Sequence, residues 1–222
     1  MRKLYSAAAL VLALSIGVLA QSYYTLSLKP SNWTTISSFS KFPLGTVRSS
    51  GALYFDFPVV TNFVPGTNQG SINYLYNIRP PKGILGASSL SVSVEVQTTG
   101  APAFNYALEP GNTCVTPATA RPFIWAYNND YGEFNRWWSN PTAFTLADGS
   151  QTMTIPLTPD RWSSVLGKFG NYDAASLAGF SAALQNVSSL GLTFGGGCFF
   201  GHGVNVSNGT ARFILSDYSV IP

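Results

Sequence analysis

The side chains best suited to a binding chemistry are concentrated in the segment 123–138. This segment reads FIWAYNNDYGEFNRWW and contains three of the five tryptophans of the chain. The flat C–H face of a sugar ring stacks on Trp or Tyr, and sugar hydroxyl groups pair with Asn, Asp, Glu and Arg. The segment therefore predicts a carbohydrate site, with the ligand-binding residues Trp125, Tyr127, Asn129, Asp130, Tyr131, Glu133, Arg136 and Trp138.

Two adjacent tryptophans end this segment. In a strand over residues 136–139, successive side chains point to opposite faces, so Arg136 and Trp138 share one face while Trp137 and Ser139 share the other. We expect one tryptophan in the core and the other accessible to a ligand. The alternative is that both are buried and that a carboxylate satisfies Arg136.

A catalytic centre is harder to assemble from this composition. The single histidine, His202, lies between two glycines, and the chain contains no Gly-x-Ser-x-Gly turn, so a Ser-His-Asp arrangement is not indicated. The glycines instead predict a turn between strands, with backbone conformations closed to other residues. The nine Asp and Glu residues form no array on one sheet face, as two-carboxylate glycoside hydrolysis would need. We predict no catalytic residue.

Oxygen-bearing side chains lie close together in the segment 128–133. Its sequence, NNDYGE, lacks the full spacing of an EF-hand loop. We expect a hydrogen-bonded turn here, with a structural Ca²⁺ site as the alternative. No other cofactor is predicted.

Charged side chains are sparse in this chain. The 12 Lys/Arg and 9 Asp/Glu residues make up 9% of it, against about 25% in ordinary soluble proteins. No run of basic residues occurs, which argues against nucleic acid as a partner. Aromatic residues reach 14%, so a packed core is expected rather than disorder.

The N-terminus has the pattern of a secretory signal. Arg2 and Lys3 precede an apolar stretch that ends in Val18-Leu19-Ala20, which predicts a signal peptide over residues 1–20. No second long apolar run follows, so we expect no membrane span after cleavage and a secreted protein, extracellular or periplasmic. Because disulfides form in exported proteins, we expect one between Cys114 and Cys198. Closing that loop would raise the free energy of unfolding by ~4 kcal/mol.

The remaining 21–222 predict one all-β domain, an antiparallel β-sandwich. Leu90, Val92, Val94 and Val96 alternate with polar residues, which is the pattern of a half-buried strand. Further strands are expected at 52–57, 72–76, 136–139, 153–157, 190–194 and 211–215.

Helical structure is expected at only two places. One or two turns are predicted from Pro159 to Leu166, and an amphipathic helix after Asp173 that places Leu177, Phe180 and Leu184 at helical spacing. Trp33 and Trp162 are expected to pack in the core or against a helix. Many short strands with long connections favour a jelly roll, with an immunoglobulin-type sandwich as the alternative.

Four segments of the C-terminal half together resemble the galactose-binding-like jelly rolls that form many carbohydrate-binding modules. They are 136–139, 149–157, 191–197 and 212–222. The resemblance implies a ligand held in loops at one end or on a concave sheet face, commonly with a structural Ca²⁺ elsewhere. Here it would implicate Trp125, Tyr127, Tyr131, Arg136 and Trp138.

These observations favour a secreted, non-catalytic protein that binds glycan or polysaccharide through an aromatic and polar patch. The first alternative is a structural or adhesive surface protein whose exposed Tyr, Asn and Thr side chains make protein contacts. The second is a polysaccharide-cleaving enzyme.

Overall fold

The computed structural model describes residues 24–37, 43–61, 71–107, 117–126, 132–196 and 200–222. The predicted signal peptide, both cysteines and the predicted site residues Tyr127, Asn129, Asp130 and Tyr131 lie outside them. The strands are β1 (Tyr24–Thr25), β2 (Trp33–Ser37), β3 (Gly45–Thr46), β4 (Leu53–Asp56), β5 (Ile72–Asn77), β6 (Ser89–Tyr106), β7 (Thr119–Ala126), β8 (Arg136–Ser139), β9 (Phe144–Thr145), β10 (Gly149–Pro156), β11 (Trp162–Ser164), β12 (Val187–Gly195) and β13 (Val204–Ile221). The helices are α1 (Ala174–Gln185) and the 3-10 turns η1 (Pro30–Asn32), η2 (Glu133–Asn135) and η3 (Pro159–Arg161).

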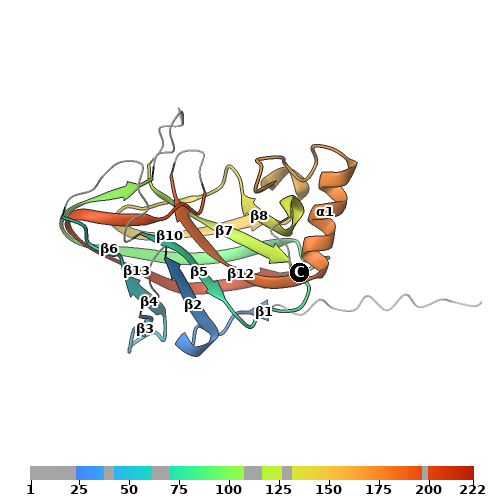
Figure 1. Cartoon of the computed structure of the whole chain (residues 1–222). Coiled ribbons are helices and arrows are strands. Elements are labelled where there is room, and N and C mark those ends of the chain that lie inside the picture. Colours follow the sequence, from blue (N-terminus) through green and yellow to red (C-terminus); the bar gives the residue numbers. More distant parts are fainter. Residues whose placement is uncertain (1–23, 38–42, 62–70, 108–116, 127–131, 197–199) are drawn as a thin grey trace, which may run out of the picture.

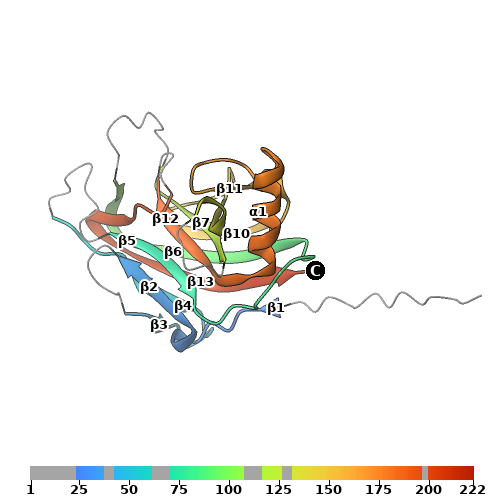
Figure 2. The same ribbon diagram turned by 45° about the vertical axis from the view of Figure 1, so that its right-hand side comes forward.

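The strands form two antiparallel layers (Figures 1 and 2). In the first, called the β6 layer, the order is β10-β6-β13-β4, with β1 on β13 and β3 on β4. In the second, called the β7 layer, the order is β2-β5-β12-β7-β8-β11, with β9 on β7. A single residue pair, Val204 with Ile72, joins β13 to β5. The architecture is the predicted antiparallel all-β sandwich.

The alternation read from the sequence places the core correctly. Leu90, Val92, Val94 and Val96 on β6 are all buried, and the polar residues between them face outward, where the hydroxyl groups of Ser93 and Thr152 hydrogen-bond at 2.8 Å. Because side chains alternate across a strand, one face of β6 supplies the core and the other meets water.

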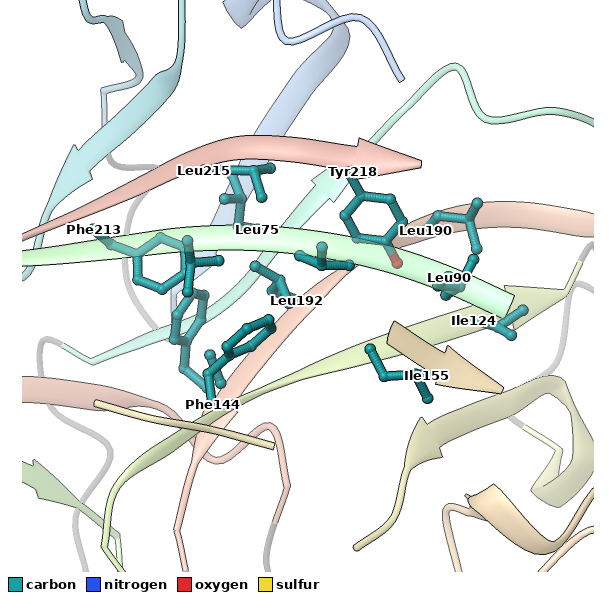
Figure 3. Packing of buried hydrophobic residues seen from close by; sticks show 14 of the residues in the cluster. Leu75, Leu90, Ile124, Phe144, Ile155, Leu190, Leu192, Phe213, Leu215 and Tyr218 are labelled. Atoms are coloured by element: carbon teal, nitrogen blue, oxygen red, sulfur yellow. The ribbon is translucent and has the colours of Figure 1, made fainter. Parts of the chain in front are cut away.

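The hydrophobic core fills the space between the layers. Phe55 on β4 and Phe213 on β13 stack at 5.4 Å between ring centroids, and both meet Phe194 of β12 edge-on, at 5.5 and 5.2 Å. Figure 3 shows side chains from both layers meeting in this space, among them Leu192 of β12 and Leu215 of β13. The two layers therefore share one core.

The predicted helix after Asp173 is confirmed as α1. Asp173 is its N-cap, and its carboxylate accepts a 2.6 Å hydrogen bond from the backbone N–H of Ser176. Phe180 and Leu184 are buried as expected, whereas Leu177 is 47% exposed. In the part of the chain that the structure describes, no helix is long and apolar enough to span a membrane.

The prediction of helix from Pro159 to Leu166 is wrong beyond its first turn. Only η3 is helical, and Trp162 to Ser164 form strand β11, paired with β8. Trp162 is fully buried, and its indole N–H donates to the carbonyl of Pro156 at 2.8 Å. Tertiary pairing with β8 therefore overrides the local helix signal, since burying this ring requires an extended backbone.

Candidate functional site

The outer face of the β7 layer gathers aromatic side chains from two strands. Cross-strand register through β12 places Tyr76 and Phe123 on either side of Gly191. Tyr74 lies two residues before Tyr76 on the same face of β5, and Trp125 lies two residues after Phe123 on β7. We call Tyr74, Tyr76, Phe123, Trp125 and the adjacent Arg136 of β8 the aromatic face.

The alternate residues of the same strands belong to the core. Leu75, Ile124 and Trp137 are buried between the layers, and the described core cluster contains none of the four rings of the aromatic face. Since successive residues of a strand point to opposite sides, these rings lie on the side away from the β6 layer.

The four rings pack on one another. Trp125 lies 4.9 Å from Phe123, 5.0 Å from Tyr74 and 5.9 Å from Tyr76, measured between ring centroids. Phe123 is fully buried, whereas Trp125 and both tyrosines are partly exposed. The cluster is thus an aromatic platform of edge-on and tilted rings, of which Tyr74, Tyr76 and Trp125 are in contact with solvent.

Gly191 allows this platform to form. A Cβ at this position would lie 2.1 Å from the carbonyl oxygen of Leu75 and 2.5 Å from the Cα of Tyr76. Both are backbone atoms, so any side chain here would push β5 and β12 apart. The glycine therefore permits the close approach of backbones that carries Tyr76 toward Phe123.

Arg136 gives the aromatic face a positive charge. It lies opposite Trp125 in the β7–β8 ladder. The pKa of the Tyr74 hydroxyl is raised, chiefly because burial disfavours the phenolate, while the Arg136 charge and a hydrogen bond with Thr193 act in the opposite direction. Tyr74 is therefore a neutral phenol at physiological pH, within the electrostatic field of Arg136.

A pocket of about 360 Å³ adjoins the aromatic face, and Trp138 forms part of its wall. Trp138 lies opposite Phe123 on β8 and opposite Ser163 on β11. The other lining residues include Ser163, Leu166, Phe200 and His202. The pocket is therefore built from one sheet face and two loops far apart in the sequence.

The expectation that Trp138 is the accessible member of its pair is wrong. Trp138 is 4% exposed and Trp137 fully buried, which agrees with the alternative that both are buried. The predicted alternation itself is confirmed, because Trp137 enters the core whereas Trp138 faces outward toward the pocket.

Arg121 carries a second charge on this side of the sheet. Its Nη1 donates to the carbonyls of Ser139 and Pro141 at 3.2 and 3.1 Å, and its guanidinium carbon lies 4.0 Å from the centroid of the Phe200 ring. Burial lowers the pKa of Arg121 to about 10, because the charged form loses hydration.

Glu133, predicted as a ligand residue, makes contacts within the protein. Its carboxylate accepts hydrogen bonds from the hydroxyl of Ser164 at 3.1 Å and from Nζ of Lys168 at 3.3 Å. These contacts tie η2 to β11 and to the loop that follows it. The charge of Glu133 is therefore largely offset by Lys168.

The structure thus brings together three of the predicted site residues, Trp125, Arg136 and Trp138, and places Glu133 nearby. Sequence reasoning missed Tyr74, Tyr76 and Arg121 as site residues. The aromatic alternation of 72–76 predicted a strand, but only the pairing of β5 with β12 and of β12 with β7 places its tyrosines beside Trp125.

The glycines around His202 behave as predicted. Gly201 and Gly203 have φ of 84° and 94°, a region that favours glycine. Between them, His202 lines the pocket beside Trp138. Among the residues that the structure describes, no three His, Cys, Asp or Glu side chains are grouped to hold a metal ion. Of the segment considered for Ca²⁺, residues 128–131 lie outside that part.

The fold and this site define the class of protein: a two-layer antiparallel β-sandwich with an aromatic and polar site on the outer face of one layer. The chain matches no protein-family model and no curated protein.

Three solved structures are similar in fold. The family 11 carbohydrate-binding module from Clostridium thermocellum, in complex with a β-1,3-1,4-mixed-linked tetrasaccharide, has 15% identity and a TM-score of 0.48 over 90% of this chain and 95% of that one. The family 11 module of a cellulosomal cellulase of Clostridium thermocellum has 12% identity and a TM-score of 0.46 over 90% and 96%. The L4b domain of human laminin alpha-2 has 9% identity and a TM-score of 0.46 over 90% and 97%.

Proposed function

We propose that this protein binds carbohydrate, without catalysis, through the aromatic face of the β7 layer. The observation that carries the proposal is the cluster of Tyr74, Tyr76 and Trp125 around Phe123, with edge-on and tilted ring contacts, on the side of the sheet away from the core. Rings needed only for folding would be buried between the layers, as Trp137 is. These rings instead keep part of their surface in water.

The chemistry of the face suits a sugar. The exposed parts of Tyr76 and Trp125 offer flat apolar surface for the C–H face of a pyranose, and Arg136 offers donors for hydroxyl oxygens. Each contact between a protein ring and a sugar ring contributes a small free energy of binding. The affinity is therefore modest for one sugar unit and rises with the number of units in contact.

Truncation of one exposed ring tests this proposal. Tyr76→Ala removes a platform ring without opening the core, and we expect at least a tenfold loss of glycan affinity, which corresponds to about 1.4 kcal/mol. Binding is measured on a glycan array and then by calorimetry with the best ligand. Tyr172→Ala is the matched control, because Tyr172 is 69% exposed and precedes α1, and it should bind like the wild type.

Other outcomes separate the alternatives. A folded wild-type protein that binds no glycan would refute the proposal and favour the structural or adhesive function. New reducing ends or unsaturated sugars in a polysaccharide digest would instead show an enzyme. Equal affinity of Tyr76→Ala and wild type would place the ligand away from the aromatic face.

We extend the proposal to export and to a disulfide between Cys114 and Cys198. Protein recovered from the medium or periplasm of an expressing cell is expected to begin at Gln21, as read by N-terminal sequencing. Its non-reducing peptide map is expected to contain the peptides of both cysteines joined. A retained N-terminus or free thiols would contradict this part of the proposal.

A further inference from the structure

Buried N–H donors without acceptors are concentrated on the outer face of the β7 layer. Within the described residues, no hydrogen-bond acceptor is found for the indole Nε1 of Trp125, the indole Nε1 of Trp138 or the Nε of Arg121. A buried polar group without a partner costs free energy, so each such group in a native structure requires an explanation.

The other tryptophans show that this pattern is not general in the chain. Trp33, Trp137 and Trp162, which face the core, each donate to a backbone carbonyl at 2.7 to 2.9 Å. Only the two tryptophans on the outer face of the β7 layer lack an acceptor in the described part of the chain. These donors therefore lie on the side of the sheet that carries the aromatic face and the pocket, and a ligand in the pocket is the acceptor that we consider for them.

Arg121 adds a positive charge to these donors. It is 8% exposed, and among the described residues no carboxylate is paired with it. A second pocket, of about 440 Å³ on the β6 layer, shows the opposite arrangement, because its Arg212 is neutralised there by Asp56 through hydrogen bonds of 2.7 and 3.0 Å. Holding a guanidinium in a buried position is costly unless an anion approaches it.

The pocket beside the aromatic face has the size for such an anion, and Arg121 adjoins it through the lining residue Phe200. Its volume of about 360 Å³ falls in the range of small-molecule sites. Trp138 and Phe200 line it, Ser163 adds a hydroxyl group, and the Arg121 guanidinium lies against the Phe200 ring. Glu133, which accepts a hydrogen bond from the pocket residue Ser164, is paired with Lys168 rather than with Arg121.

We propose that this pocket binds the acidic group of a charged sugar, the carboxylate of a uronic acid or a sulfate ester. The inference rests on the proposed carbohydrate binding and narrows it to acidic glycans. Carboxylate and sulfate share the chemistry that matters here, since both are anions that offer several acceptor oxygens and no strong donor. Charge-assisted hydrogen bonds to such oxygens are about twice as strong as neutral ones.

The wild-type protein tests the inference first. An array with neutral, uronic-acid and sulfated glycans is followed by titration with polygalacturonate and with the same polymer after reduction of its carboxyl groups. We expect at least tenfold tighter binding to the acidic polymer, weakening as salt rises. The sulfated spots distinguish the two acidic groups. Equal or tighter binding of neutral glycans would overturn the inference while leaving the proposed function intact, whereas binding to none would refute both.

Substitutions then locate the anion. Arg121→Gln is expected to remove most of the preference for acidic over reduced polymer. Arg48→Gln removes the same charge from an exposed residue between β3 and β4 and should retain that preference. Folded Arg121→Gln protein with unchanged preference would overturn the inference.

A second substitution decides the matter if Arg121→Gln fails to fold. Trp138→Phe keeps an aromatic ring in the pocket wall and deletes the indole N–H. We expect a severalfold loss of affinity for the acidic polymer and little change for the reduced one. Unchanged affinity for the acidic polymer in the folded variant would count against the pocket as the anion site.

Discussion

Tyr218 is a phenol buried between the two layers. Its hydroxyl donates to the carbonyl of Gly191 at 3.3 Å, which links β13 of one layer to β12 of the other. Burial raises the pKa of Tyr218 well above the ordinary value of 10.0, because the phenolate would lose its hydration. The Tyr218 hydroxyl therefore links the two layers and also makes the free energy of unfolding depend on pH.

Tyr218→Phe separates these two effects. Below pH 10 the folded and unfolded chains both keep the phenol proton, and we expect the variant to be less stable than the wild type by about 1 kcal/mol. Above pH 10 the unfolded wild-type chain loses the proton and the folded chain keeps it, so wild-type stability falls as pH rises. The difference between the two proteins should then shrink.

Urea denaturation at pH 7 and pH 11 measures this change. Tyr172→Phe, an exposed control, should follow the wild type at both pH values. A constant difference between Tyr218→Phe and the wild type at the two pH values would contradict the buried neutral phenol.

At the scale of elements, Phe180 is the largest side chain by which α1 packs on the sandwich, beside the buried Ala183 and Leu184. Phe180 lies 5.1 Å from Trp137 and 6.3 Å from Trp162 between ring centroids. Directly before it in the chain, Gly179 lies so close to Phe134 of η2 that a Cβ there would be 2.5 Å from the Phe134 Cβ. The helix therefore closes one end of the core around Phe180.

Phe180→Ala is expected to lower the free energy of unfolding by about 3 to 5 kcal/mol, since it leaves a cavity between two buried indoles. Chemical denaturation monitored by tryptophan fluorescence measures this loss. Leu177→Ala is the matched control on the same helix and should change stability by less than about 0.5 kcal/mol, because Leu177 is exposed. Comparable losses in both variants would mean that α1 packs through a different face.

The elements were predictable where local signals decide them. The alternation around Leu90 to Val96 and the Asp173 cap lie within one stretch of chain, and both were predicted correctly. The segment after Pro159 was not, because β11 depends on its pairing with β8, which is distant in sequence. Likewise, the aromatic face requires four strands, β5, β12, β7 and β8, to be aligned in register, and no local pattern specifies that alignment.

At the scale of the whole molecule, the site and the core are two sides of the same sheet. The β7 layer presents Trp137 to the core and Trp138 to the pocket, so the stability of the sandwich also fixes the geometry of the site. Because Phe55 and Phe213 of the β6 layer contact Phe194 of the β7 layer, we expect the two layers to unfold together.

Phe213→Ala tests this coupling across the layers. The substitution is made in the β6 layer, whereas the fluorescence of Trp137 and Trp162 reports on the β7 layer. We expect a loss of about 3 to 5 kcal/mol, with the fluorescence and far-ultraviolet circular dichroism midpoints shifted equally, as a two-state transition requires. Ile78→Ala, at an exposed position, should leave both midpoints in place. A fluorescence midpoint that stays fixed while the circular dichroism midpoint falls would show that the β7 layer, and the site on it, is stable without the shared core.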